Sequence, residues 1–204
     1  SLRSPSERAV ASRSRIAGVP SVMEFPRFNL ETRVIMERCG RVDPEEIHDY
    51  IAEGGYATLA DVLERAPAGI IEEIAASGLR GRGGAGFPTG RKWALAREAG
   101  GTEKVVICNA DEGDPGAYMD RTLLESNPHQ ILEGMIICGH AVGAGRGIVY
   151  VRSEYPLAVR TIRRAIEQAR GFGLLGKGVL GSGLEVVVAP RRCDKRREDE
   201  RADV

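Results

Sequence analysis

The second half of the chain alternates between short apolar runs and longer segments whose apolar residues recur at helical spacing. The short runs are rich in Val and Ile, which predicts buried strands, and they span residues 104–108, 147–152 and 184–189. Residues 128–142 and 156–170 lie between these runs and have the periodicity of amphipathic helices. The expected inward positions of the second helix are Leu157, Val159, Ile162 and Ile166. This alternation predicts an α/β domain with a mostly parallel sheet and crossover helices.

The region before the first predicted strand has the pattern of several short helices. Asp43 and Pro44 suit the start of one, because Asp can cap a helix and Pro fits its first turn. Gly54 and Gly55 are expected to end it. Further helices are expected at residues 56–65, 68–77 and 91–99, and a loop at 109–120. The helices before residue 77 predict a small helical lead-in that spans residues 23–76.

The two ends of the chain differ in composition from its middle. Residues 1–22 are rich in Ser and Arg and predict a disordered segment or a linker. Residues 77–189 form the expected α/β domain, and 11 of the 15 residues at 190–204 are charged. Two interpretations of that last segment stay open: a solvated tail, or an artefact of truncation or reading frame.

Composition excludes several classes of protein. Lys and Arg balance Asp and Glu at 29 each in 204 residues, which argues against a nucleic-acid binder. No apolar run reaches the roughly 20 residues of a membrane helix, and no secretory signal is visible, so we expect a cytoplasmic protein without direct membrane insertion. The cysteines are scattered and predict buried free thiols in a reducing compartment; they are Cys39, Cys108, Cys138 and Cys193. The histidines lie apart in helical segments, and none is assigned a catalytic or metal-binding role; they are His48, His129 and His140.

The segment 77–93, SGLRGRGGAGFPTGRKW, is the strongest functional signal. Glycines allow positive φ and close approach to the backbone, so that peptide N–H groups and nearby cations can bind an anion. The candidate binding residues here are Gly81, Arg82, Gly83, Gly84, Ala85, Gly86, Phe87 and Lys92. Residues 81–86 match G-x-G-x-x-G, but a helical segment precedes them where a dinucleotide fold has a strand. The spacing is not that of a Walker A loop either, and a flexible hinge remains the alternative. Phe87, Pro88 and Trp93 argue against that hinge, because they are expected to anchor the loop and the following helix.

An acid-rich loop follows the first predicted strand. Ligands of open α/β sheets bind at the carboxyl ends of strands, which makes this loop the second candidate site. Its candidate residues are Asn109, Asp111, Glu112 and Asp114. Carboxylates accept hydrogen bonds, so the loop suits the ring N–H or ribose hydroxyls of a nucleotide whose phosphate lies at the glycine segment. A polar turn and a calcium loop are the alternatives, although the spacing is not that of an EF-hand.

These segments together resemble a known family. Residues 77–93, ICNADEGDPGAYMDR at 107–121, LLESNPHQILEGMIICGHAVGA and YVRSEYPLA at 150–158 resemble, in order and spacing, the flavoprotein subunit of NADH:quinone oxidoreductase (respiratory complex I). The diaphorase subunits of NAD-reducing hydrogenases and formate dehydrogenases are its relatives. The resemblance runs from about residue 39 to 189 and implies a Rossmann-like fold that binds FMN and NADH.

The resemblance also implies roles for the candidate residues. Gly81 to Gly84 and Lys92 would contact FMN, Asn109, Asp111 and Glu112 would line the flavin, and Phe87 would stack on NADH. Asp114 stands where relatives often have Glu, and Leu95 replaces a second aromatic residue of some relatives.

In the family, hydride passes from NADH to FMN, and electrons continue to iron–sulfur centres. The family's Gly-Glu-Glu-Thr segment and the cysteines of its [4Fe–4S] cluster have no counterpart in this sequence. The implied partners are NADH and other subunits of a redox complex, including an iron–sulfur subunit, and the complex would lie in the cytoplasm or at the inner membrane. Two alternatives to a catalytic fragment stay open: a non-catalytic nucleotide-binding remnant and a subunit-docking module.

Overall fold

The computed structural model describes residues 32–101, 103–176 and 185–191. The expected disorder or linker at 1–22 and most of the charged segment 190–204 lie outside the described residues. The predicted domain boundaries therefore stay predictions, while the α/β architecture between them can be compared with the structure.

A parallel sheet forms the centre of the molecule. Its three strands are β1 (Val105–Ala110), β2 (Arg146–Arg152) and β3 (Glu185–Arg191), in the order β1-β2-β3. Both pairings are parallel, with Cys108 opposite Val149 and Val149 opposite Val188. The predicted mostly parallel sheet is confirmed. β1 and β3 end later than expected: β1 includes Asn109, and β3 continues to Arg191.

The described helices match most of the predicted segments. They are α2 (Ile47–Ala52), α3 (Ala57–Leu63), α4 (Pro67–Ala76), α5 (Thr89–Glu98), α6 (Met119–Ser126), α7 (Pro128–Val142) and α8 (Pro156–Gly171). α7 begins and ends where its pattern predicted. α6 was not predicted, because Tyr118 at its N-cap makes no side-chain capping bond and its amides are capped by a distant residue described below.

The expected start of α2 was wrong by one turn. The Asp43 carboxylate accepts the Glu45 N–H at 2.9 Å, which makes a local turn, and the helix begins only at Ile47. Its predicted end is confirmed. Gly54 has a φ of +81°, and a Cβ added to Gly55 would lie 2.1 Å from the Tyr50 ring.

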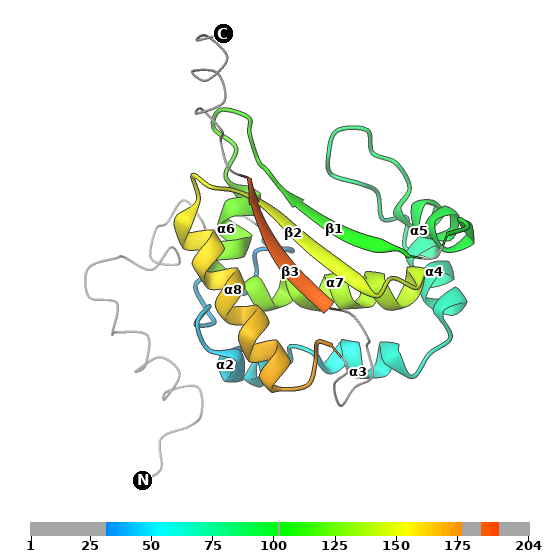
Figure 1. Ribbon diagram of the computed structural model, residues 1–204, viewed down its shortest axis with the longest axis horizontal. Helices are drawn as coiled ribbons and strands as arrows, with labels where there is room; N and C mark the ends of the chain where they lie inside the picture. Colours follow the sequence, from blue (N-terminus) through cyan, green and yellow to red (C-terminus); the bar gives the residue numbers. More distant parts are fainter. Residues whose placement is uncertain (1–31, 102, 177–184, 192–204) are drawn as a thin grey trace, which may run out of the picture.

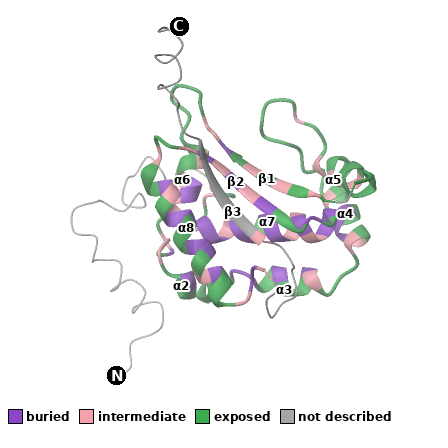
Figure 2. Ribbon diagram, in the orientation of Figure 1, coloured by how far each residue is buried: buried purple, intermediate pink, exposed green. Residues whose placement is uncertain are grey.

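One face of the sheet is closed by helices and the other is open. α7 packs against β1 and β2, α8 packs against β3, and both lie on the same side of the sheet (Figure 1). On that side Val149 and Val151 are fully buried, whereas Ile107, which alternates to the other side, is 62% exposed. Figure 2 shows the buried residues gathered between the sheet and these helices. The core therefore lies on one face only.

The inward face of α8 differs from the expected one. Ile162 and Ile166 are buried as predicted, Val159 is half-buried, and Leu157 is 37% exposed. The buried face consists mainly of small residues: Ala158, Thr161, Ile162, Ala165, Ile166 and Ala169. These residues recur at helical spacing from Ala158 onward and form one face of the helix. Leu157 lies one residue before Ala158, and one residue turns a helix by about 100°, so its side chain lies off that face. The large side chain therefore misled the prediction.

A buried carboxylate joins the helical lead-in to the rest of the fold. Glu133 on α7 accepts hydrogen bonds from the Tyr50 hydroxyl at 2.6 Å, the Tyr56 N–H at 3.1 Å and the Leu59 N–H at 3.3 Å. The Tyr56 hydroxyl in turn lies 2.9 Å from Nδ1 of His129, also on α7. Burial and the Glu133 carboxylate raise the pKa of Tyr50. α2 and α3 are thus held on α7 by polar contacts inside the core.

Replacing Glu133 by Ala will destabilise the fold by about 3 kcal/mol, because buried donors of the lead-in lose their acceptor. Glu167→Ala, which removes an exposed carboxylate from α8, is the matched control and should change the free energy of unfolding by less than about 0.5 kcal/mol. Urea denaturation measures both. Equal midpoints for the two variants would show that Glu133 does not hold the lead-in.

His129 makes the fold sensitive to acid. Burial lowers the pKa of His129, which the structure holds between Tyr56 and the Gln168 side chain at 3.1 Å. A lowered pKa means that this contribution to stability is complete above about pH 6.5 and is lost as pH falls below that value. Denaturation at pH 7.5, 6.5 and 5.5 should show a falling free energy of unfolding, with a slope of at most about 1.4 kcal/mol per pH unit from this group. His129→Gln should flatten that slope, and an unchanged slope would contradict the assignment.

Candidate functional site

The glycine-rich segment forms a loop with a paired neck between α4 and α5. Arg80 and Pro88 make an antiparallel bridge, in which the Gly81 N–H donates to the Phe87 carbonyl at 2.9 Å. The Thr89 N–H donates to the Leu79 carbonyl at the same distance. The loop of residues 81–87 is therefore closed at its base by the backbone, and α4 precedes it, in place of the strand of a dinucleotide fold.

The top of this loop offers open backbone donors. Within the residues that the structure describes, the N–H groups from Arg82 through Phe87 donate to no protein acceptor. A Cβ added to Gly83 or Gly84 would meet no atom within 4 Å, and Gly84 has a φ of +100°. Successive open amides beside unfilled space are the donor set that binds an anion such as a phosphate. The residues present thus fit the phosphate of a nucleotide.

Cations and one aromatic ring surround the loop. The Arg91 guanidinium lies 5.8 Å from the centre of the Phe87 ring, and Phe87 is 43% exposed. Lys92 is exposed on α5 and lies near enough to Cys138 on α7 to oppose the burial that raises the pKa of that thiol to about 11. The loop therefore ends in an accessible π face with the Arg91 charge beside it, while the contact shown for Lys92 is with α7.

Phe87 does not anchor the loop as expected. Its ring is at the surface. Trp93, by contrast, is half-buried and packs against the main core and against a smaller buried cluster that consists of Val62, Ile70, Ile71 and Ala141. A Cβ on the buried Gly90 would lie 2.6 Å from Cα of Ala75, so α5 approaches α4 through this glycine. The loop is anchored by α5 and by its backbone bridge, and Phe87 is left accessible.

The acidic loop begins at the carboxyl end of β1. Asn109 is exposed on the open face of the sheet, and its side-chain oxygen accepts the Asp111 N–H at 3.2 Å. Asp114 is exposed and its carbonyl accepts the Ala117 N–H at 3.1 Å, in a turn where Gly116 has a φ of +82°. Asn109 and Asp114 therefore keep side-chain hydrogen-bonding capacity toward solvent, while the loop itself is built from local turns.

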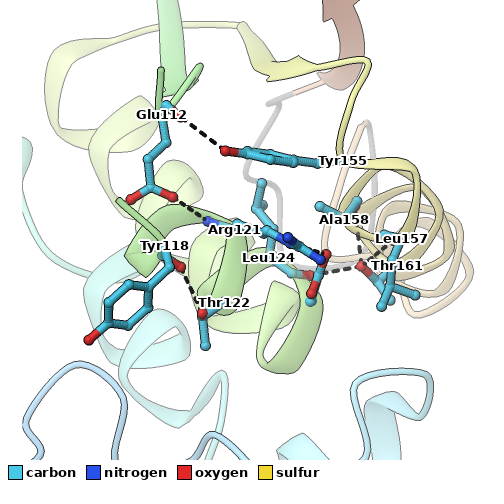
Figure 3. Close-up of polar contacts among 10 residues, drawn as sticks. Glu112, Tyr118, Arg121, Thr122, Leu124, Tyr155, Leu157, Ala158 and Thr161 are labelled. Carbon is cyan, nitrogen blue, oxygen red and sulfur yellow. Dashed lines mark hydrogen bonds and ion pairs between the residues drawn. The ribbon is translucent and has the colours of Figure 1, made fainter. Parts of the chain in front are cut away.

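Glu112 is engaged by the protein itself. Its two carboxylate oxygens accept the N–H groups of Asp120 and Arg121, each at 3.1 Å, and so cap the start of α6 (Figure 3). Burial, with the Glu112 carboxylate next, raises the pKa of Asp120. The carboxylate that sequence reasoning assigned to the flavin is thus committed to α6.

Arg152 and Tyr155 contact the acidic loop, and sequence reasoning gave neither a role. The Tyr155 hydroxyl donates to the Glu112 carbonyl at 3.0 Å, and Arg152 Nη1 lies 3.4 Å from the same oxygen. Both belong to the segment YVRSEYPLA, which carries part of the family resemblance but indicates no role for either residue. The signal that could have found them is the parallel order of the strands, because Arg152 ends the strand beside β1.

The two candidate loops are separate. Figure 1 shows both on the same side of the molecule, near opposite ends of β1. The backbone bonds at the neck of the glycine loop run within residues 79–92, and the Glu112 contacts lead to α6, Arg152 and Tyr155. The fold therefore presents two separate sets of groups, one of open amides and cations and one of polar acceptors.

Other groups of the described chain are structural. Burial raises the pKa of Cys108 to about 11, so this thiol is neutral. Cys39, Cys108 and Cys138 are free, as predicted, but each is only half-buried. Cys193 lies outside the described residues. Over residues 32–101, 103–176 and 185, no three His, Cys, Asp or Glu side chains are close enough to hold a metal ion. No helix in the same part of the chain is both long and apolar enough to span a membrane.

Comparisons with known proteins agree on one family. The model of the Nuo51 FMN-binding domain matches residues 74–192. The chain is 52% identical over 155 residues to the NADP-reducing hydrogenase subunit HndC of Solidesulfovibrio fructosivorans, a match that covers 76% of this chain and 31% of the relative. It is 44% identical over 169 residues to a subunit of the NADH-quinone oxidoreductase of Aquifex aeolicus, a match that covers 81% of this chain and 39% of the relative.

A solved structure shows the same fold. The crystal structure of NAD+-reducing [NiFe]-hydrogenase in the air-oxidized state matches with a TM-score of 0.58 and 27% identity, over 92% of this chain and 31% of that chain. The present chain thus spans about a third of the length of these relatives.

The matched range begins in α4, just before the glycine loop, and ends just beyond β3, so it includes both candidate loops and the whole sheet. The chain belongs to the Nuo51 FMN-binding domain family.

Proposed function

We propose that this chain is the FMN- and NADH-binding part of an NADH-dependent oxidoreductase. The observation that carries the proposal is the run of open backbone amides from Arg82 through Phe87, with Lys92 on the helix that follows. Family membership supports it, and so do the names of the relatives, which all involve a nicotinamide nucleotide.

The residues divide the work of binding. The open amides of Arg82 through Gly86, with the charges of Arg82 and Lys92, hold the FMN phosphate, because successive amide donors and cations bind anions. Asn109 and the backbone of Asp111 and Glu112 face the flavin ring, and Asp114 accepts a hydrogen bond from a hydroxyl of the nucleotide. Phe87 offers its exposed face to a ring of NADH.

FMN, when bound, supplies the hydride acceptor. The chain's own contribution is to bind and orient both nucleotides, and no side-chain acid or base is needed for that transfer. This agrees with the structural roles of His129 and His140, the latter of which lies 3.1 Å from the Arg65 carbonyl.

The proposal includes partners. The relatives are named as subunits, so the chain would act beside other subunits, including an iron–sulfur protein, in the cytoplasm or peripherally at the inner membrane. The [4Fe–4S] cluster of the family would belong to the part of the relatives that this sequence does not match.

Gly83→Val should raise the FMN dissociation constant at least tenfold. The structure leaves room for the new side chain in the free protein, so the loss reports on a ligand that approaches the backbone. Gly100→Val is the control, since Gly100 is also exposed and its Cβ would also meet nothing within 4 Å. Quenching of FMN fluorescence measures both. Equal affinities would remove the glycine loop from the site.

Phe87→Ala should raise the dissociation constant or KM for NADH on the FMN-loaded chain, because one base–aromatic stack is worth about 1–3 kcal/mol. Phe172→Ala removes a similarly exposed ring beside His48 and should leave NADH binding unchanged. NADH titration and NADH:ferricyanide reduction provide the readouts. Turnover would exclude the non-catalytic remnant, while FMN binding without turnover would support it.

A further inference from the structure

Glu112 is held at both its backbone and its side chain. The carboxylate caps α6, and the carbonyl accepts the Tyr155 hydroxyl at 3.0 Å and faces Arg152 Nη1 at 3.4 Å. Figure 3 shows Glu112 between the start of α6 and the Tyr155 ring. This residue is therefore the point at which the acidic loop is attached to the rest of the domain.

Arg152 makes further contacts with the same loop. Its Nε lies 4.0 Å from the nearer carboxylate oxygen of Asp111, and the two side chains are only 28% and 22% exposed. A Cβ added to Gly113 would lie 3.8 Å from Arg152 Nη1, so the loop passes directly over the guanidinium. One cation thus touches the loop at successive residues.

Tyr155 connects that contact to the helices. The Arg121 guanidinium lies 5.3 Å from the centre of its ring, and the Arg152 guanidinium 5.9 Å. Tyr155 also directly precedes α8, which packs against α6. These contacts hold the Tyr155 ring, and with it the hydroxyl that donates to the Glu112 carbonyl.

We infer that Arg152 and Tyr155 are positioning residues, which hold the acidic loop through the Glu112 carbonyl so that Asn109 and Asp111 face the flavin; this inference rests on the proposed function. Neither side chain needs to touch the ligand. They restrict a loop whose own contacts are local turns. The conformational entropy of the loop is therefore already lost in the free protein and does not oppose binding.

Tyr155→Phe is the sharpest test, because it keeps the ring and removes only the hydroxyl. Its matched control is Thr161→Val, which removes another hydroxyl that bridges α6 and α8, donated to the Leu124 carbonyl at 2.8 Å and away from the loop. Both variants should lower the urea midpoint by similar small amounts. Only Tyr155→Phe should raise the FMN dissociation constant, by about fivefold, and Arg152→Met should raise it further.

Two more readouts separate positioning from general destabilisation. Hydrogen exchange of the Asp120 and Arg121 amides, measured without ligand, should accelerate in Tyr155→Phe and Arg152→Met and not in Thr161→Val. In Tyr155→Phe and Arg152→Met, the affinity for riboflavin should fall by the same factor as the affinity for FMN. Lys92→Gln should lower the affinity for FMN only, because riboflavin lacks the phosphate.

The inference is overturned when Tyr155→Phe and Thr161→Val change FMN affinity and amide exchange equally. Failure of the wild-type chain to bind FMN would overturn the proposed function and, with it, the flavin-facing role of the loop. In that case the exchange measurement still decides whether Arg152 and Tyr155 hold the loop, because it needs no ligand.

Discussion

The parallel pairing of β1 with β2 sets the position of the acidic loop and of the side chains that hold it. Because parallel strands end at the same edge of a sheet, Ala110 lies opposite Val151, and the residues that follow each strand come together. Asp111 therefore meets Arg152, and the Glu112 carbonyl comes within reach of Tyr155. A shift of this register by one residue would move all these groups to the wrong face of the sheet.

Polar groups in this domain fall into two sets with different roles. Some are fully used by the fold, such as the Glu133 carboxylate inside the core and the Glu112 carboxylate at the start of α6. Others are left open in the described chain, above all the amides from Arg82 through Phe87. Unpaired donors are tolerated at the surface because water satisfies them, and they remain available to a ligand.

The one-sided core explains where such open groups can occur. Helices α7 and α8 close one face of the sheet, so the opposite face, with Ile107 and Asn109, stays accessible beside both candidate loops. The glycine loop can extend on that side because α5 is fixed separately, through the close approach of Gly90 to α4. The candidate binding groups and the packed core thus lie on different sides of the sheet.

Periodicity in the sequence was enough to predict the strands, most of the helices and the parallel sheet, and glycine and acidic residues marked both candidate loops. Periodicity and glycine content are local properties, and they identify α7 or the loop at residues 81–87 without knowledge of any partner residue. The family also followed from these segments, because their order and spacing are carried by the chain itself.

Features built between distant segments could not be predicted from local patterns. The cap of α6 comes from Glu112, outside the helix, and Tyr118 at the N-cap makes none, so α6 was missed. The inward face of α8 was chosen by its packing on the sheet, which buried Ala158 and exposed Leu157. The contacts of Arg152 and Tyr155 with the acidic loop were missed for the same physical reason: contacts over about forty residues depend on strand register, which no local pattern encodes.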